Sequence, residues 1–350
     1  MCLWLYLLKY KKLHMDKCLP IYFALSNSKL VKENGEVLTQ AELLKLWEFL
    51  NLLIGSRYST FIMRGESNEN LKAQYNFDTE MPELLAQCIF MAGEKGRICW
   101  NAKKYLDPDN TSLENFESIC KALKKDIRDG CKGKSNRTYL MQDFYSRNKV
   151  FCDAFELSDD LIHIYEQLSI NDRKRINLYY LSIAHTINSH KYKEASSFIS
   201  TTTNSDVADQ FTSDATIYGW VPRSQMRKRL KSIEYVITEN SSYVKRLGLP
   251  CCDTPVYPEQ KEIALRCGIL PHFIIGFKVD RNFYVNPSIF RTMAKMEDID
   301  TFRKLCAFKR NFICNGLEVD QNNFNEFCRK TNFKRYYTYD GNKYEIHYLY

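Results

Sequence analysis

Residues 257–279 constrain the fold more than any other stretch, because they contain two runs with the period of a β-strand and a glycine between them. Residues 262–267 alternate in polarity, which is the pattern of a half-buried strand. Gly268 ends this run, and residues 273–279 alternate again, which predicts a second strand of the same sheet. The inward face of the first predicted strand carries Ile263, Leu265 and Cys267.

The first of these strands also presents two polar side chains together. The period of two places Gln260 and Glu262 on one face, where a loop enters a strand. Chemistry is often carried by loop ends that a rigid strand holds in place. An amide and a carboxylate in this position are therefore candidate functional groups.

Helical and strand periodicities both recur along the rest of the chain, which predicts a protein of the α+β class. Thr39 with Glu42, and Thr111 with Glu114, match the capping box that opens a helix. Helices are predicted over 39–55, 82–93, 111–130, 159–168, 172–187 and about 287–329. Strands are predicted over 58–63, 196–203, 215–221 and 233–237, with a hairpin at Asp340-Gly341.

Composition narrows the class of protein and of partner. A chain of 350 residues with 45% hydrophobic content can form one large domain or two ordinary ones. Its net charge of +8 favours an anionic partner such as nucleic acid, an acidic protein or a phosphate-bearing cofactor. The basic run from Arg223 to Lys231 is either a solvated helix face or a contact for nucleic acid.

The cysteines and the N-terminal residues predict an intracellular protein. None of the 13 cysteines forms a Cys-x-x-Cys pair, so reduced thiols in the cytoplasm explain them better than disulfides or a metal site. The apolar residues 2–8 are too few to span a bilayer, and the lysines follow them instead of preceding them. We therefore expect neither a secretion signal nor a membrane anchor, and Met15 is an alternative start.

Three short polar motifs occur one after another along the chain, each on a stretch with strand-like sequence. They are Arg64-Gly65, Ser200-Thr201-Thr202 and Gln260-x-Glu262. In this order they resemble the arginine, serine and glutamate motifs of the toxin-like mono-ADP-ribosyltransferases. The resemblance covers residues 57–67 and 196–279, and each motif taken alone is common in unrelated strands.

The resemblance implies a site for NAD as co-substrate. Arg64 would clamp the pyrophosphate of NAD, because a guanidinium matches phosphate oxygens. The backbone at Gly65 would hold the nicotinamide amide, and Ser200 would lie near the nicotinamide ribose and orient the catalytic carboxylate. The same resemblance assigns cofactor-binding roles to Thr201, Thr202 and Phe211.

The resemblance also implies which groups carry the chemistry, and none of them is a metal ligand. Glu262 would stabilise the positive charge that develops on the ribose as nicotinamide leaves. Gln260 would position the acceptor, and Tyr257 would contact it from the preceding loop. Family members that modify arginine usually have glutamate at the position of Gln260, so glutamine leaves other protein side chains or a nucleic acid as acceptors.

The expected architecture is an ADP-ribosyltransferase-like split β-sandwich core with additions. The core would comprise residues 1–67 and 191–280, a helical insertion residues 68–190, and a helical and hairpin C-terminal extension residues 281–350. The 136 residues from Arg64 to Ser200 exceed what a minimal family member needs, which is why an insertion is expected.

The predicted function is transfer of ADP-ribose from NAD to a macromolecule, with RNA or DNA slightly favoured as acceptor. Such a toxin would need an inhibitory partner protein resembling an antitoxin. Three alternatives stay open at this point: a transferase that modifies proteins, an NAD glycohydrolase with water as acceptor, and a non-catalytic module that binds nucleic acid.

Overall fold

The computed structural model describes most of the chain. The described residues are 19–55, 59–95, 106, 108–132, 138–157, 160–187, 198–211, 214–222, 233–252, 262–266, 268–295, 316–318, 335–339 and 344–348. They contain both helices and a mixed sheet, so the expected mixed α and β class is confirmed. No helix among them is long and apolar enough to cross a membrane.

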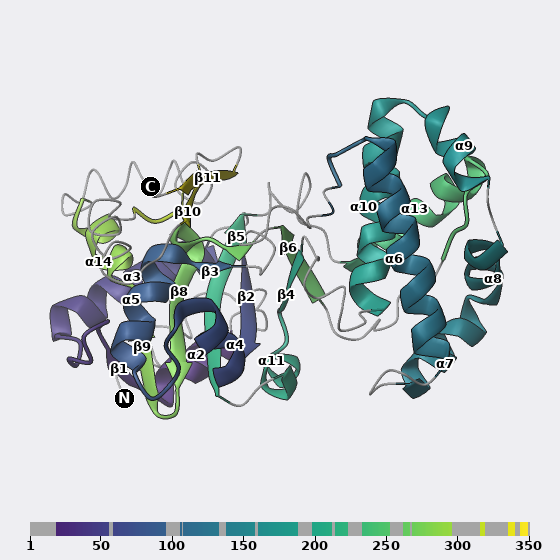
Figure 1. The fold of residues 1–350 in the computed structure, drawn as a ribbon. Helices are drawn as coiled ribbons and strands as arrows, with labels where there is room; N and C mark the ends of the chain where they lie inside the picture. Colours follow the sequence, from purple (N-terminus) through teal and green to yellow (C-terminus); the bar gives the residue numbers. More distant parts are fainter. Residues whose placement is uncertain are drawn as a thin grey trace. The chain divides into compact units, whose positions relative to one another are not determined.

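A seven-stranded sheet contains all three strands that carry the sequence motifs (Figure 1). Its order is β1 (Lys29–Val31), β9 (Asn282–Val285), β8 (Ile274–Val279), β5 (Ala215–Pro222), β2 (Ser59–Glu66), β4 (Phe198–Thr202) and β6 (Glu262–Arg266). β1 pairs with β9 in parallel, whereas the pairs β9 with β8, β8 with β5, β5 with β2 and β2 with β4 are antiparallel.

Two small sheets complete the described strands. β3 (Glu94–Lys95) pairs with β7 (Gly268–Ile269), and β10 (Arg335–Tyr339) pairs antiparallel with β11 (Tyr344–Tyr348). The last pair has the two strands of the predicted hairpin, whose Asp340-Gly341 turn lies outside the described residues.

The chain divides into two compact units, each built from separate segments. The first unit comprises residues 1–94, 201–228 and 269–350, and the second comprises residues 95–200 and 229–268. The division falls within β4, between Ser200 and Thr201. The domain boundaries expected from the sequence stay a prediction.

Helices cover the sheet residues of the first unit. They are α2 (Leu19–Ser26), α3 (Gln40–Gly55), α4 (Asn68–Tyr75), α5 (Pro82–Ala92), α11 (Ser205–Phe211), the 3-10 helix η5 (Pro271–Phe273) and α14 (Pro287–Ala294). Trp220 of β5 is fully buried in the core, with edge contacts to Phe49 of α3 and Phe273 of η5 at centroid distances of 5.4 and 5.5 Å.

Gly276 allows two strands of the first unit to approach closely. A Cβ atom at this position would lie 2.3 Å from the carbonyl oxygen of Tyr284, in the neighbouring strand β9. Real atoms do not approach to that distance, so a larger residue would force β8 and β9 apart. The glycine in the predicted second strand is therefore required by packing.

The second unit is a helical assembly built around α10 (Ile170–Ile187). The other helices among its described residues are α6 (Leu113–Cys131), α7 (Thr138–Arg147), α8 (Lys149–Leu157), α9 (Leu161–Glu166) and α13 (Ile233–Arg246). α6 and α10 lie side by side in Figure 1 and pack together. Their aromatic core includes Phe116 stacked on Tyr165 at 3.7 Å and Phe155 edge-on to Tyr180 at 5.0 Å.

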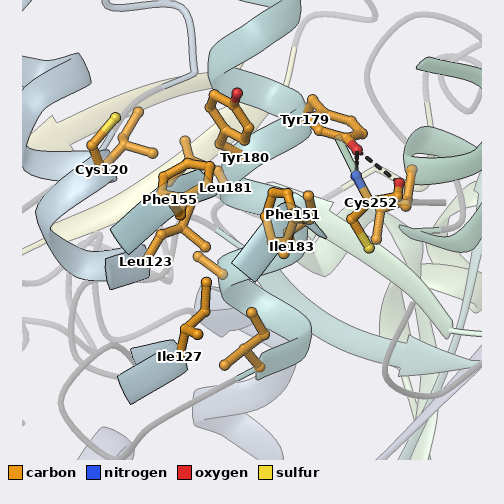
Figure 2. Packing of buried hydrophobic residues seen from close by; sticks show 14 of the residues in the cluster. Cys120, Leu123, Ile127, Phe151, Phe155, Tyr179, Tyr180, Leu181, Ile183 and Cys252 are labelled. Atoms are coloured by element: carbon orange, nitrogen blue, oxygen red, sulfur yellow. Dashed lines mark hydrogen bonds between the residues drawn. The ribbon is translucent and has the colours of Figure 1, made fainter. Parts of the chain in front are cut away.

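Two tyrosines of α10 fasten a loop segment to this core. The hydroxyl of Tyr179 donates to the carbonyl of Cys252 at 2.7 Å and accepts from the Cys252 amide at 2.6 Å (Figure 2). The hydroxyl of Tyr180 donates to the carbonyl of Pro250 at 3.0 Å. Both tyrosine side chains are fully buried, so the segment 250–252 is held by α10.

Replacing Tyr179 by phenylalanine is expected to destabilise the protein by about 1–3 kcal/mol, because buried backbone groups of Cys252 lose a hydrogen-bond partner. The free energy of unfolding, measured by urea denaturation, checks this. Tyr139→Phe is the control, since that side chain is 69% exposed on α7. Equal stabilities for the two variants would contradict the prediction.

Most local predictions are confirmed. The capping box of Thr39 and Glu42 is formed, with Thr39 N donating to Glu42 Oε2 at 2.8 Å and Glu42 N to Thr39 Oγ1 at 3.3 Å. The helix expected at 82–93 is α5, with a proline in its first turn and Gly93 at its end. The predicted helix at Pro287 begins as α14, and most of the remainder up to residue 329 lies outside the described residues.

Three local predictions are wrong. Residues 233–237 begin helix α13 and form no strand, since Val236, Ile237 and later Val244 are buried at helical spacing. The cap of α6 is Ser112, one residue after Thr111, and its hydroxyl accepts from Asn115 N at 3.2 Å. The third concerns β6, which is buried on both faces, because Ala264 is as buried as Ile263 and packs into the helical core.

Candidate functional site

The second unit brings three polar side chains together from three elements. His185 lies near the end of α10, Ser200 lies on β4, and Glu262 opens β6. The Nε2 atom of His185 is 2.9 Å from Ser200 Oγ and 2.9 Å from Glu262 Oε1. Two of the three residues, Ser200 and Glu262, are the serine and glutamate of the predicted motifs.

The histidine and the carboxylate of this group are mostly buried. The side chains of His185 and Glu262 are 8% and 13% exposed, and the ring of His185 packs edge-on against Phe198 at 5.7 Å. A carboxylate at this depth needs a hydrogen-bond donor, since burial of an unpaired charge is costly. The imidazole of His185 provides one.

The shared nitrogen limits what the three groups can do. In a serine hydrolase, one ring nitrogen of the histidine contacts the nucleophile and the other contacts the carboxylate. Here the same Nε2 faces both Ser200 and Glu262. An ionised Glu262 can only accept, so Nε2 must carry the proton, and it then cannot take a proton from Ser200. The arrangement does not fit a nucleophilic serine.

In the first unit, Arg64 lies in an acidic environment. Its Nε donates to Glu66 Oε1 on the same strand and lies 3.6 Å from Glu94 Oε1 of β3. The guanidinium side chain is 22% exposed, and the two carboxylates are at most 1% exposed. Among the residues that the structure describes, no donor reaches Glu66 Oε2. The cation is thus outnumbered by two buried carboxyl groups.

Burial, followed by the charge of Glu66, raises the pKa of Glu94 to about 8, against a smaller opposing effect of Arg64. The hydrogen bonds fit a protonated carboxyl group. The hydroxyl of Tyr75 lies 2.8 Å from the carbonyl oxygen of Gly93 and 2.6 Å from Glu94 Oε2, yet it has one proton. A neutral Glu94 can donate to Tyr75, which then donates to Gly93. Gln74 Nε2 donates to the other oxygen of Glu94 at 3.0 Å.

The other predicted site residues are distributed as follows. Gly65 pairs with Thr216 of β5 in the first unit, and Thr202 pairs with Met63 of β2. The hydroxyl of Thr202 accepts from Asn204 N at 3.0 Å, so it shapes the turn before α11. The remaining residues are Thr201, which is 3% exposed, Phe211, which ends α11 and whose side chain is not described, and Tyr257 and Gln260, which lie outside the described residues.

Sequence reasoning missed three of these groups. The sequence assigns no role to His185, because its partners are 15 and 77 residues away and no local spacing connects them. Glu94 is likewise distant from Arg64 in the sequence, at a separation of 30 residues. Glu66, however, shares a strand face with Arg64 at a separation of two residues, and that spacing could have predicted the ion pair.

Comparisons with known proteins give no further guide. The chain has no significant match to a family model, to a curated protein or to a solved structure. Within the described parts of the chain, no group of three or more histidine, cysteine, aspartate or glutamate side chains is arranged to hold a metal ion.

Proposed function

We propose that the protein transfers ADP-ribose from NAD to a macromolecular acceptor. The observation that carries this proposal is the meeting of Ser200 and Glu262 at one imidazole, on two strands that are neighbours in the sheet. A serine that orients the catalytic glutamate is what the resemblance to the mono-ADP-ribosyltransferases implies. The split β-sandwich core of that family is part of the same proposal.

Transfer of ADP-ribose passes through a positively charged ribose, which a carboxylate held in a fixed position can stabilise. The bond between the ribose carbon and the nicotinamide nitrogen breaks, and its electron pair leaves with nicotinamide. A lone pair of the acceptor forms the new bond to the same carbon, and the acceptor loses its proton to water. Positive charge develops on the ribose after nicotinamide begins to leave and before the new bond is complete. Glu262, held in place by His185, would stabilise that charge. Ser200 would orient the carboxylate and bind a ribose hydroxyl.

Glu262 fits this role better than a role as a buried structural charge. Its side chain keeps 13% of its surface exposed, so it is not fully enclosed by the described residues. Its carboxylate already has an N–H donor in His185, which stabilises the ionised form that the reaction needs. The second oxygen of a carboxylate can accept from a ribose hydroxyl at the same time.

For Arg64, contact with the NAD pyrophosphate stays a prediction. Two carboxyl groups already face the guanidinium, and they oppose the binding of a further anion. The raised pKa of Glu94 lessens this conflict, because a protonated Glu94 leaves Arg64 opposite the single charge of Glu66.

We propose nucleic acid as the acceptor, on the grounds of the net charge of +8 and the predicted basic run from Arg223 to Lys231. That run lies outside the described residues, as does Gln260. The inhibitory partner protein belongs to the same proposal, since an intracellular enzyme of this kind would harm its own cell.

The test uses the purified full-length protein with NAD labelled in the adenine ring. Nicotinamide release is measured with RNA, DNA, cell protein or no acceptor present. The proposal expects label that remains on RNA or DNA after protease treatment and is removed by nuclease. Label removed by protease would instead indicate a protein acceptor. Full-rate release without any acceptor would indicate an NAD glycohydrolase, and no release would overturn the proposed activity altogether.

A further inference from the structure

One helix contacts the chain on both sides of the segment 253–261. Before that segment, Tyr179 of α10 binds the backbone of Cys252 (Figure 2), and Tyr180 donates to the carbonyl of Pro250. After it, His185 of the same helix contacts Glu262 at 2.9 Å. α10 itself packs against α6 and α13 around a buried aromatic core. The position of Glu262 is therefore set by a rigid element and not by a loop.

The hydrogen bond from His185 differs from an ordinary core contact. Its donor faces two oxygens at once, the hydroxyl of Ser200 and the carboxylate of Glu262, each at 2.9 Å. Both distances lie within the range of good hydrogen bonds. One N–H shared between them fixes the direction of the carboxylate relative to the hydroxyl. An apolar side chain of the same size would fill the space without fixing either group.

We infer that His185 is a positioning residue, which holds the Glu262 carboxylate and the Ser200 hydroxyl in the geometry that stabilises charge on the ribose. This role rests on the proposed function and adds a residue of α10 to the site. It requires the N–H at the Nε2 position, because Glu262 in its ionised form can only accept. His185 itself would touch neither NAD nor the acceptor.

Two amide variants separate this role from simple packing. His185→Gln can place a side-chain N–H near the position of Nε2, whereas the shorter His185→Asn cannot reach Glu262. The rate constant kcat for nicotinamide release is expected to fall about 10-fold to 100-fold in His185→Asn, with the KM for NAD little changed, because a hydrogen bond to a charged group is lost. His185→Gln should stay within a few-fold of the unchanged protein.

A double-mutant cycle strengthens the test. If His185 acts through Glu262, then His185→Asn should lower the residual rate of Glu262→Gln by much less than it lowers the rate of the unchanged protein. Equal factors in both backgrounds would indicate an effect on folding alone, and would overturn the inference. His163→Asn is the control, because His163 is exposed on α9 in the same unit.

A measurement without NAD separates this inference from the proposed function. Nitrogen NMR of the histidine-labelled protein should show a proton on Nε2 of His185, and the signal should shift in Glu262→Gln but not in Glu239→Gln. An unprotonated Nε2 would overturn the positioning role even if the protein transfers ADP-ribose. The positioning role would also be overturned if the unchanged protein is active and kcat for nicotinamide release is equal in His185→Asn and His185→Gln. Complete inactivity of the unchanged protein would overturn the proposed function and this role with it.

Discussion

Replacing Glu262 by glutamine is expected to lower the rate of nicotinamide release from NAD by about 100-fold to 1000-fold, since a preorganised charge is removed from the point where charge develops. Glutamine has nearly the same shape as glutamate and can still accept from His185 Nε2, so the fold should be retained. Steady-state kinetics with labelled NAD measure the change in rate. A rate within a few-fold of the unchanged protein would contradict the assignment of Glu262.

The control for this experiment is Glu239→Gln. Glu239 is exposed on α13 in the same unit as Glu262, so its replacement changes the net charge equally but leaves the site intact. Growth of the expressing cells provides a second measurement. Induction of the unchanged gene should slow growth, and induction of the Glu262→Gln gene should not. Equal growth of the two cultures would count against the enzymatic proposal.

Replacing Glu94 by glutamine is expected to change how the stability of the protein depends on pH. The ordinary pKa of this carboxyl group is 4.5, and in the folded protein it is raised to about 8. At pH values between these two pKa values, the carboxyl group of Glu94 is ionised in the unfolded chain but protonated in the folded protein. The free energy of unfolding therefore falls as pH rises through this window, by up to about 1.4 kcal/mol per pH unit. The contribution of Glu94 to the free energy of unfolding is fully present below the lower pKa, and it is lost as pH rises through the upper pKa.

Glutamine resembles the protonated acid, so Glu94→Gln should remove this fall and make the protein more stable than the unchanged one toward about pH 8. Its amide can donate to the Tyr75 hydroxyl, and its oxygen can accept from Gln74. Urea unfolding at several pH values measures the effect through tryptophan fluorescence, because Trp220 is fully buried in the same unit.

The matched variant for the pH series is Glu48→Gln, at an exposed position of α3 in the same unit. It should show the same dependence of unfolding free energy on pH as the unchanged protein. Parallel curves for Glu94→Gln and Glu48→Gln would mean that Glu94 does not hold its proton in the folded state.

The structural features predicted best from the sequence are those that depend on residues close together in the chain. The capping box of Thr39 and Glu42 is local, and its hydrogen bonds are formed as expected. At α6 two adjacent hydroxyl residues, Thr111 and Ser112, were both able to cap, and the choice between them depends on the path of the chain. Residues 233–237 contain β-branched and aromatic side chains in a run too short to distinguish a strand from the first turns of a helix.

The candidate site was only partly predictable because its parts are distant in the sequence. Ser200 and Glu262 were proposed as partners from their motifs, and the structure brings both to His185. Nothing in the sequence near His185 indicates two partners on different strands. The burial of β6 on both faces was missed for the same reason, since Ala264 is covered by helices that its neighbours in the sequence do not reveal.

The attachment of β6 to α10 has a practical consequence for shortening this protein. A truncated protein made by excising residues 68–190 would lose His185 together with Tyr179 and Tyr180, so Glu262 would keep its place in the chain but lose its contact with His185. A shortened protein that is meant to keep the group of His185, Ser200 and Glu262 must therefore include helix α10.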